Sequence, residues 1–252
     1  MVNKEELEKI KEKALTEHIP IIMDETLEVI EKYLKKIKPK NMLEIGTAVG
    51  YSTLCFTEYL EKDGRIDTIE RDAQRVEEAR ENIKKAGVAD VINIYEGDAV
   101  EILPTLNSKY DVCFIDAAKG KYPFFLQQAL RLLNDHGIIF ADNILYKGYV
   151  MSDYNKHKQR TAVRNLREYI KEASENTMLK TEILDVGDGL AISQKKKWTL
   201  RNVPKVHFLY KVYFFSIIYD ISSRNISWQR VRNFFPFSIS GIYYWAIFYD
   251  VF

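Results

Sequence analysis

This 252-residue sequence contains few cysteines, has almost no net charge and has no long apolar run near its start. Its two cysteines, Cys55 and Cys113, lie in apolar segments and far from any CxxC spacing, so we expect neither a disulfide framework nor a zinc site. The formal net charge of +1 does not favour a general nucleic-acid or membrane binder. Residues 1–18 are charged throughout, and we expect no signal peptide and a cytoplasmic location.

The composition changes sharply near Lys197. Of the 32 aromatic residues, 17 lie in residues 198–252, including all three Trp, and Glu is absent there. We therefore expect one domain over residues 1–197, with no membrane contact, and an aromatic-rich tail of uncertain status over residues 198–252. Pro236 and Gly241 interrupt the last apolar stretch, which argues against a membrane-spanning helix and leaves partner docking or membrane-surface binding open. The preferred hypothesis is that the tail is not a selected domain, as translation past a lost stop codon or a frameshift would give.

The periodicity of residues 1–197 alternates between helix and strand, which is typical of a parallel sheet with crossover helices. Gly187-Asp188-Gly189 is too short for a crossover, so the two closing strands should pair as an antiparallel hairpin. We expect an α/β fold with a mostly parallel sheet, an antiparallel C-terminal hairpin and helices on both faces. The expected helices are 3–16, 24–37, 51–62, 73–87, 99–106, 122–133 and 157–173, and the expected strands are 42–45, 65–70, 91–95, 111–115, 137–141, 181–186 and 190–193.

The first strand leads into a turn with the sequence EIGTAVG, residues 44–50. Its glycines allow the backbone to pass close to a ligand, and the helix that follows offers free N–H groups to an anion. The turn is not a GxGxxG dinucleotide motif, and a tight turn that simply needs glycine remains an alternative. The second strand ends in Glu70, where an acidic residue can bind both ribose hydroxyls. Together these features indicate a pocket for a nucleoside that carries a small charged group.

Polar residues also end two later strands of the predicted sheet. Asp116 follows the apolar run VCFI, with Lys119 three residues later, and Asp142-Asn143 follows the strand GIIFA. The carboxyl ends of neighbouring parallel strands meet at the edge where open α/β sheets bind ligands. Two carboxylates and an amide oxygen are hard ligands that suit Mg²⁺. A helix N-cap at Asp116 and an Asx turn at Asp142-Asn143 are equally compatible with these residues alone.

Taken in order, five motifs resemble those of the class I S-adenosylmethionine-dependent methyltransferases. Within that class, residues 4–196 resemble the cation-dependent O-methyltransferases related to catechol and caffeoyl-CoA O-methyltransferases. The resemblance implies a Rossmann-like methyltransferase fold and S-adenosylmethionine as cofactor. The motifs are LEIGTAVGYST (43–53), Ile69-Glu70, EGDA (96–99), FIDAAKGKY (114–122) and FADN (140–143).

The resemblance also implies a role for each matching residue. It places Gly46 at the methionine portion of the cofactor, Ser52 at its carboxylate, Glu70 at the ribose and Asp98-Ala99 at the adenine, with Met23 in a lid segment. The implied cofactor-binding residues are Met23, Glu44, Gly46, Ser52, Glu70, Asp98, Ala99 and Asp116.

The same resemblance assigns the metal and the base. Asp116, Asp142 and Asn143 would bind a divalent cation, Mg²⁺ or Mn²⁺, and Lys119 would be the catalytic base. Methyl transfer from a sulfonium is an in-line displacement, so the enzyme must hold the two reactants at attack distance and present a deprotonated oxygen. Lys119 can accept that proton only when it is neutral, which a neighbouring cation favours.

The methyl acceptor should offer two adjacent oxygens, as both a catechol and a 5-hydroxyuridine do. The segments HIPIIMDETLEVI, DNILYKG and VGDGLAIS look most like bacterial enzymes that methylate 5-hydroxyuridine at the tRNA wobble position. Residues 144–171 hold seven Lys or Arg against two acidic residues, which suits a tRNA anticodon or a merely solvated helix face. A small catechol-type acceptor is the alternative, a non-enzymatic binding protein is a weaker one, and the family resemblance implies a homodimer.

Removal of residues 198–252 tests whether this tail contributes to the activity. A chain that ends at Lys196 should be more soluble than the full chain and equally active, because exposed apolar sequence promotes aggregation. Sedimentation of the purified proteins and methyl transfer per mole of protein measure the two effects. Loss of activity on truncation would refute the idea that the tail is dispensable.

Overall fold

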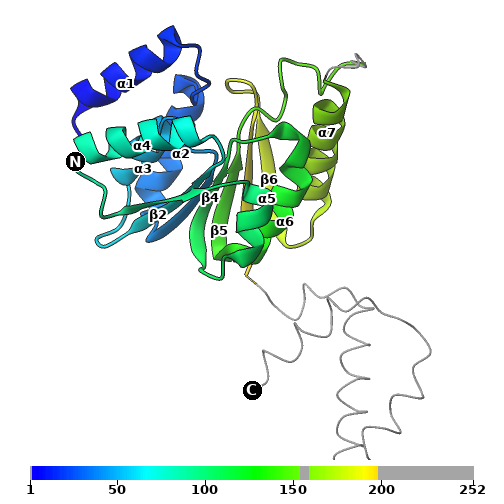
Figure 1. The fold of residues 1–252 in the computed structure, drawn as a ribbon. Helices are drawn as coiled ribbons and strands as arrows, with labels where there is room; N and C mark the ends of the chain where they lie inside the picture. The colour runs from blue at the N-terminus through cyan, green and yellow to red at the C-terminus, as the bar shows by residue number, and fades with distance from the viewer. Residues whose placement is uncertain (1, 154–158, 198–252) are drawn as a thin grey trace, which may run out of the picture. The chain divides into compact units, whose positions relative to one another are not determined.

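The structure is a computed structural model that describes residues 2–153 and 159–197. In this part of the chain a seven-stranded sheet lies between two layers of helices (Figure 1). Contacts divide the chain into two units after Trp198. The predicted tail lies outside the described residues.

The sheet has the strand order β3-β2-β1-β4-β5-β7-β6. β1 to β5 are parallel, and β7 is antiparallel to both of its neighbours, β5 and β6. This confirms the mostly parallel sheet with an antiparallel C-terminal hairpin, in which the last strand lies inside the sheet and β6 forms the edge. The strands are β1 (Asn41–Ile45), β2 (Arg65–Glu70), β3 (Ile92–Glu96), β4 (Tyr110–Ile115), β5 (Leu133–Ala141), β6 (Leu179–Leu184) and β7 (Leu190–Lys195).

The helices occur in the expected order, although several of their boundaries differ from the expected ones. The helix predicted over 51–62 ends at Thr57, because the chain turns there and Glu61 N donates to Pro39 O (3.0 Å). No helix in the described ranges is long and apolar enough to cross a bilayer. The helices are α1 (Lys4–Thr16), α2 (Asp24–Ile37), α3 (Tyr51–Thr57), α4 (Ala73–Lys85), α5 (Ala99–Ile102), α6 (Tyr122–Leu132) and α7 (Arg160–Glu175), with 3-10 turns η1 (Leu103–Thr105) and η2 (Lys119–Lys121).

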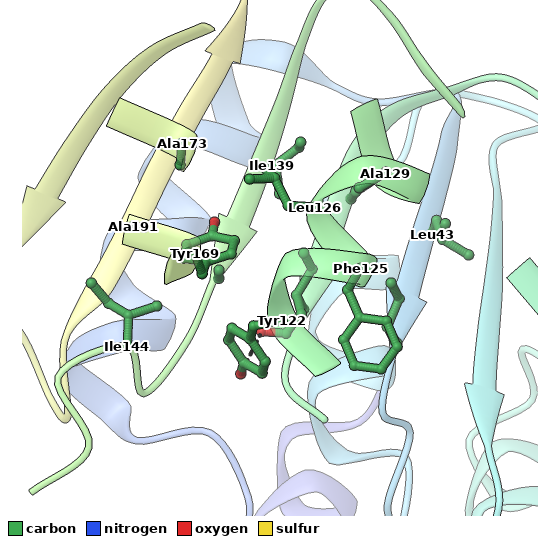
Figure 2. Packing of buried hydrophobic residues seen from close by; sticks show 14 of the residues in the cluster. Leu43, Tyr122, Phe125, Leu126, Ala129, Ile139, Ile144, Tyr169, Ala173 and Ala191 are labelled. Atoms are coloured by element: carbon green, nitrogen blue, oxygen red, sulfur yellow. Dashed lines mark hydrogen bonds between the residues drawn. The ribbon is translucent and has the colours of Figure 1, made fainter. Parts of the chain in front are cut away.

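Two apolar cores cover the two faces of the sheet. Along β4, Cys113 and Ile115 face the core shared with α6 and α7, whereas Val112 and Phe114 face the core shared with α1, α2 and α3. This alternation is the period-2 geometry of a strand buried on both faces. Figure 2 shows the first core, where aromatic rings of α6 and α7 meet over the sheet. Both cysteines are buried and free.

The register of the parallel strands β1, β4 and β5 aligns their carboxyl ends at one edge of the sheet. Ile45 at the end of β1 pairs with Ile115 at the end of β4, which in turn pairs with Ala141 at the end of β5. The residues that follow these three strands therefore lie side by side. This edge of the sheet is where the predicted site residues gather.

Candidate functional site

Gly46 follows β1 at a point where only a glycine fits. Its φ is +108°, and a Cβ there would lie 2.1 Å from the carbonyl oxygen of Asp116. The Gly46 N–H donates to Ile69 O (3.0 Å), which fixes the turn against β2. Glycine is therefore required by the close approach of two backbones as well as by the left-handed φ.

Glu44 lies in the last part of β1 and is completely buried. Its carboxylate accepts hydrogen bonds from the hydroxyls of Ser52 (2.6 Å), Thr68 (2.6 Å) and Thr53. Thr68 is also hydrogen-bonded to the hydroxyl of Thr47 (2.6 Å). This hydrogen-bond network connects β1 and β2 to the start of α3. Glu44 and Ser52, both predicted to bind the cofactor, are hydrogen-bonded to each other within it.

Burial raises the pKa of Glu44 to about 7, and the three hydroxyl donors partly oppose this shift. A carboxyl group in a low-dielectric site loses the hydration of its charged form, which is why its proton is held more tightly. Glu44 is thus a buried acid that titrates near neutral pH.

Glu70, at the end of β2, fastens the turn after β1. Its carboxylate accepts from the backbone N–H of Ala48 (2.9 Å), Arg71 (2.9 Å) and Asp72 (3.0 Å). Three amide donors hold the side chain in one orientation at the carboxyl edge. A ribose-binding role for Glu70 stays a prediction.

Two other predicted cofactor residues lie at helix starts. Asp98 caps α5 by accepting from Val100 N (2.8 Å), directly before Ala99. Met23 precedes α2 and is 45% exposed. Its sulfur lies beside Gly187 in the turn of the closing hairpin. Both residues are thus at ends of elements, where a ligand can reach them.

Asp116 and Asp142 occupy equivalent places after β4 and β5. Asp116 N donates to Ile45 O and Asp142 N to Ile115 O, each at 3.0 Å, so the sheet ladder continues for one residue beyond the strands. Lys119 Nζ donates to Asn143 Oδ1 (2.9 Å) and lies 3.8 Å from Asp116 Oδ1. The structure therefore brings the predicted metal ligands and the predicted base to one point.

The two carboxyl groups at this point are electrostatically strained. Burial, together with the charge of Asp116, raises the pKa of Asp142 to about 7, and the hydrogen bond from the N–H of Asn143 opposes the rise. Burial also raises the pKa of Asp116, and the Lys119 ammonium opposes this. Asp142 is 1% exposed, and its Oδ2 has no hydrogen-bond partner within residues 2–153 and 159–197. A buried carboxylate oxygen without a partner is costly unless something binds it.

The donor set limits which metals fit. Within residues 2–153 and 159–197, no group of three or more His, Cys, Asp or Glu is arranged to hold a metal. The predicted set instead combines two carboxylates with the amide oxygen of Asn143. Such an oxygen set suits a hard cation that keeps part of its water shell, and does not suit zinc.

Comparison with known proteins identifies the family. The O-methyltransferase family matches residues 3–196. The chain belongs to this family. It is 36% identical to a catechol O-methyltransferase from Niastella koreensis over 61% of this chain and 72% of that protein. It is also 34% identical to tapetum-specific methyltransferase 1 from Arabidopsis thaliana over 69% of this chain and 76% of that protein.

Solved structures agree with this assignment. A putative caffeoyl-CoA O-methyltransferase from Staphylococcus aureus is 33% identical, with a TM-score of 0.70 over 75% of this chain and 91% of that chain. An O-methyltransferase from Bacillus cereus, solved in complex with SAH, is 25% identical, with a TM-score of 0.70 over 77% of this chain and 92% of that chain. The chain thus has the Rossmann-like methyltransferase fold that its motifs imply.

Several residues at this edge of the sheet were not among the site residues predicted from the sequence. Asp188 accepts from Lys147 N, and Tyr122 donates its hydroxyl to Asp142 O (2.8 Å). The ring of Tyr146 lies 6.0 Å from Lys119 Nζ. Asp188 could have been found from the sequence, because it is an acidic residue between two glycines in the turn of the predicted hairpin. The other two contacts depend on tertiary packing alone.

Glu44→Gln should flatten the pH dependence of this O-methyltransferase's stability. The folded-state pKa of about 7 exceeds the ordinary 4.5, so the stability due to Glu44 is full below pH 4.5 and is lost as pH rises through 7. At 1.36 kcal/mol per pKa unit, the loss is on the order of 3 kcal/mol.

Urea unfolding of the wild type and the variant at pH 5 and pH 8 measures the difference. Glu25→Gln, at an exposed position on α2, is the matched control. Equal loss of stability with pH in wild type and Glu44→Gln would show that Glu44 titrates normally.

Proposed function

We propose that this chain is an S-adenosylmethionine-dependent O-methyltransferase that uses a divalent cation and methylates one of two adjacent oxygens on a small catechol-type acceptor. The observation that carries the proposal is the convergence of Asp116, Asp142, Asn143 and Lys119 at the end of β4 and β5. The names of the curated relatives, catechol and caffeoyl-CoA O-methyltransferases, support the acceptor class.

The turn after β1 supports the cofactor assignment. Gly46 has no side chain, so the backbone at the carboxyl edge is open to a ligand. The carboxylate of Glu70 accepts three backbone N–H groups, one of them in the same turn. A related O-methyltransferase from Streptomyces achromogenes was solved in complex with SAM, at 25% identity. We assign the methionine portion to Gly46 and Ser52, the ribose to Glu70 and the adenine to Asp98-Ala99.

The residues present fit a divalent cation. Asp142 Oδ2 is buried and has no hydrogen-bond partner in the part of the chain that the structure describes. Asp116 and Asn143 contribute further oxygens, both close to Lys119 Nζ. Mg²⁺ or Mn²⁺ held by these three side chains would polarise an acceptor hydroxyl and lower the cost of forming its oxyanion. The same charge would favour the ionised forms of both carboxyl groups.

Lys119 supplies the base in this proposal. Its Nζ is within hydrogen-bond reach of Asn143 and is held near Asp116. A neutral Lys119 would accept the proton of the acceptor hydroxyl. Bound S-adenosylmethionine would supply an electrophilic methyl group, whose bond to sulfur would be replaced by a bond to the acceptor oxygen while the sulfur keeps the electron pair. The chain's contribution is therefore to orient the reactants and to remove one proton.

Substitutions at the site should separate binding from chemistry. Asp142→Ala should abolish methyl transfer and leave S-adenosylmethionine affinity largely intact, because this side chain is assigned to the acceptor side. Asp116→Ala should also abolish transfer, and Lys119→Ala should lower kcat by about 10²–10⁴. Isothermal titration with the cofactor and initial rates measure the two properties.

Asp185→Ala, at an exposed acidic position, is the control for loss of a carboxylate. Excess EDTA should reproduce the Asp142→Ala result. Full activity in EDTA would rule out the cation, and unchanged kcat in Lys119→Ala would place the base elsewhere.

A wobble 5-hydroxyuridine in tRNA is the second candidate acceptor. Arg160 and Arg164 are exposed on the first half of α7, and α7 packs against η2, which begins with Lys119. Phosphate contacts from these guanidinium groups would suit an anticodon stem. Arg167 is another of the seven basic residues in residues 144–171, but it donates to backbone carbonyls. Lys156 and Lys158, also among the seven, lie outside the described residues.

Salt dependence distinguishes the two acceptors. Charge reversal of Arg160 and Arg164 together should leave catechol turnover unchanged, because neither residue belongs to the assigned site. For tRNA, the logarithm of binding affinity should fall with the logarithm of salt by about 0.9 per phosphate contact.

Initial rates with labelled S-adenosylmethionine and separate pools of catechols and tRNA test both acceptors. Methylation of tRNA with steep salt dependence, and none of catechols, would overturn the catechol assignment. Mass spectrometry of tRNA from cells that lack the gene then shows whether 5-hydroxyuridine accumulates.

A further inference from the structure

Helix α7 is bonded to the turn that carries Lys119. Asn165 Nδ2 donates to Gly120 O, in the middle of η2. A Cβ at Gly120 would lie 4.0 Å from the same Asn165 atom. Within the same turn, Lys121 N donates to Ala118 O (2.9 Å). The amide of Asn165 therefore fixes the backbone directly after the proposed base.

The same helix is bonded to the opposite flank of the site. Arg167 Nε donates to Val150 O (2.9 Å), and its Nη2 donates to Tyr149 O (3.2 Å) and Ser152 O. A positively charged guanidinium group that donates to three backbone carbonyls within four residues is a strong and directional anchor. It fastens residues 149–152, which end the segment that follows Asn143. This segment, residues 144–152, is called the acceptor loop below.

The acceptor loop places an aromatic ring beside the base. The Tyr146 ring lies 6.0 Å from Lys119 Nζ and packs edge-on against Tyr149, with 5.9 Å between centroids. Tyr146 and Lys147 both have positive φ, 42° and 57°. Such values are unfavourable for residues with a side chain, so contacts outside the loop must hold them.

Helix α7 can serve as a rigid support because its inner face is part of the core. Tyr169 packs edge-on against Tyr122 with 5.6 Å between ring centroids (Figure 2). Leu166 is fully buried, and it separates Asn165 from Arg167 in sequence. Successive helix residues turn by about 100°, so these two polar side chains leave the helix on opposite flanks of Leu166. One reaches η2 and the other reaches the acceptor loop.

We propose that Asn165 and Arg167 are positioning residues that set the gap between the base and the acceptor loop from one helix. Asn165 governs where Lys119 lies, and Arg167 governs where Tyr146 and the acceptor loop lie. This inference rests on the proposed function for its catalytic consequence, but the two anchors exist whatever the acceptor is.

Hydrogen exchange tests the anchors without any substrate. Asn165→Ala should speed amide exchange in residues 117–122 and leave residues 144–152 unchanged. Arg167→Gln should do the reverse. Parallel loosening of both segments in both variants, or no change in either, would overturn the proposal. Asn165→Gln and Arg167→Lys are milder variants that keep a donor, and each should show a smaller effect on the same segment.

Kinetics test the consequence. Asn165→Ala should lower kcat by about 10-fold or more at unchanged acceptor KM, since displacement of a catalytic group by about 1 Å is costly. Arg167→Gln should raise the acceptor KM by a similar factor with a smaller effect on kcat. S-adenosylmethionine affinity should stay the same in both. Assays run well below each variant's Tm exclude effects of unfolding.

Glu168→Ala is the matched control, because Glu168 is exposed on the same turn of α7. It should change neither the exchange pattern nor the kinetics. If both variants show lower kcat, higher acceptor KM, weaker cofactor binding and a lower Tm together, the two residues only stabilise the fold. If the exchange pattern is as expected but no acceptor is methylated, the proposed function fails and the anchors stand.

Discussion

The hydrogen-bond ladder between parallel strands continues one residue beyond β4 and β5, and the whole site depends on this. Asp116 N bonds to Ile45 O and Asp142 N bonds to Ile115 O, so two acidic side chains are held at neighbouring strand ends. The same closeness leaves no room for a Cβ at Gly46, which would meet the Asp116 carbonyl. Backbone pairing thus fixes the turn at Gly46, which we assign to the cofactor, and the neighbouring carboxylates of Asp116 and Asp142.

Buried carboxylates in this protein fall into two kinds. Glu44 receives three hydroxyl hydrogen bonds, so its polar atoms are satisfied within the fold. One carboxylate oxygen of Asp142 accepts from Asn143 N (2.6 Å), and the other has no hydrogen-bond partner among the described residues. A satisfied buried acid supports the fold, whereas an unsatisfied one near a second carboxylate and a lysine marks a place where an external group is expected.

The closing hairpin and α7 connect this edge to the rest of the domain. Because β7 lies beside β5, the backbone of Gly189 accepts from Ile144 N (3.0 Å), directly after Asn143. Gly187, at the other end of the turn, approaches Met23 and Thr26 of the α2 segment, and a Cβ there would lie 2.4 Å from Thr26 Oγ1. The turn thus joins the segment proposed for the cofactor to the segment proposed for the acceptor, while α7 joins the base to the acceptor loop.

Local sequence patterns are enough to predict the order and type of the elements, the parallel sheet with its closing hairpin, and the positions of Asp116, Asp142 and Asn143 after strands. These follow from local periodicity and from the rule that parallel strands end at the same edge. The folded chain was needed to show that β7 lies inside the sheet, that α3 ends at Thr57, and that Lys119 reaches Asn143. It also revealed Arg167 as an anchor for carbonyls within its own chain. These features depend on contacts between residues far apart in sequence, and a side chain's partner across such a distance leaves no periodic pattern in the chain.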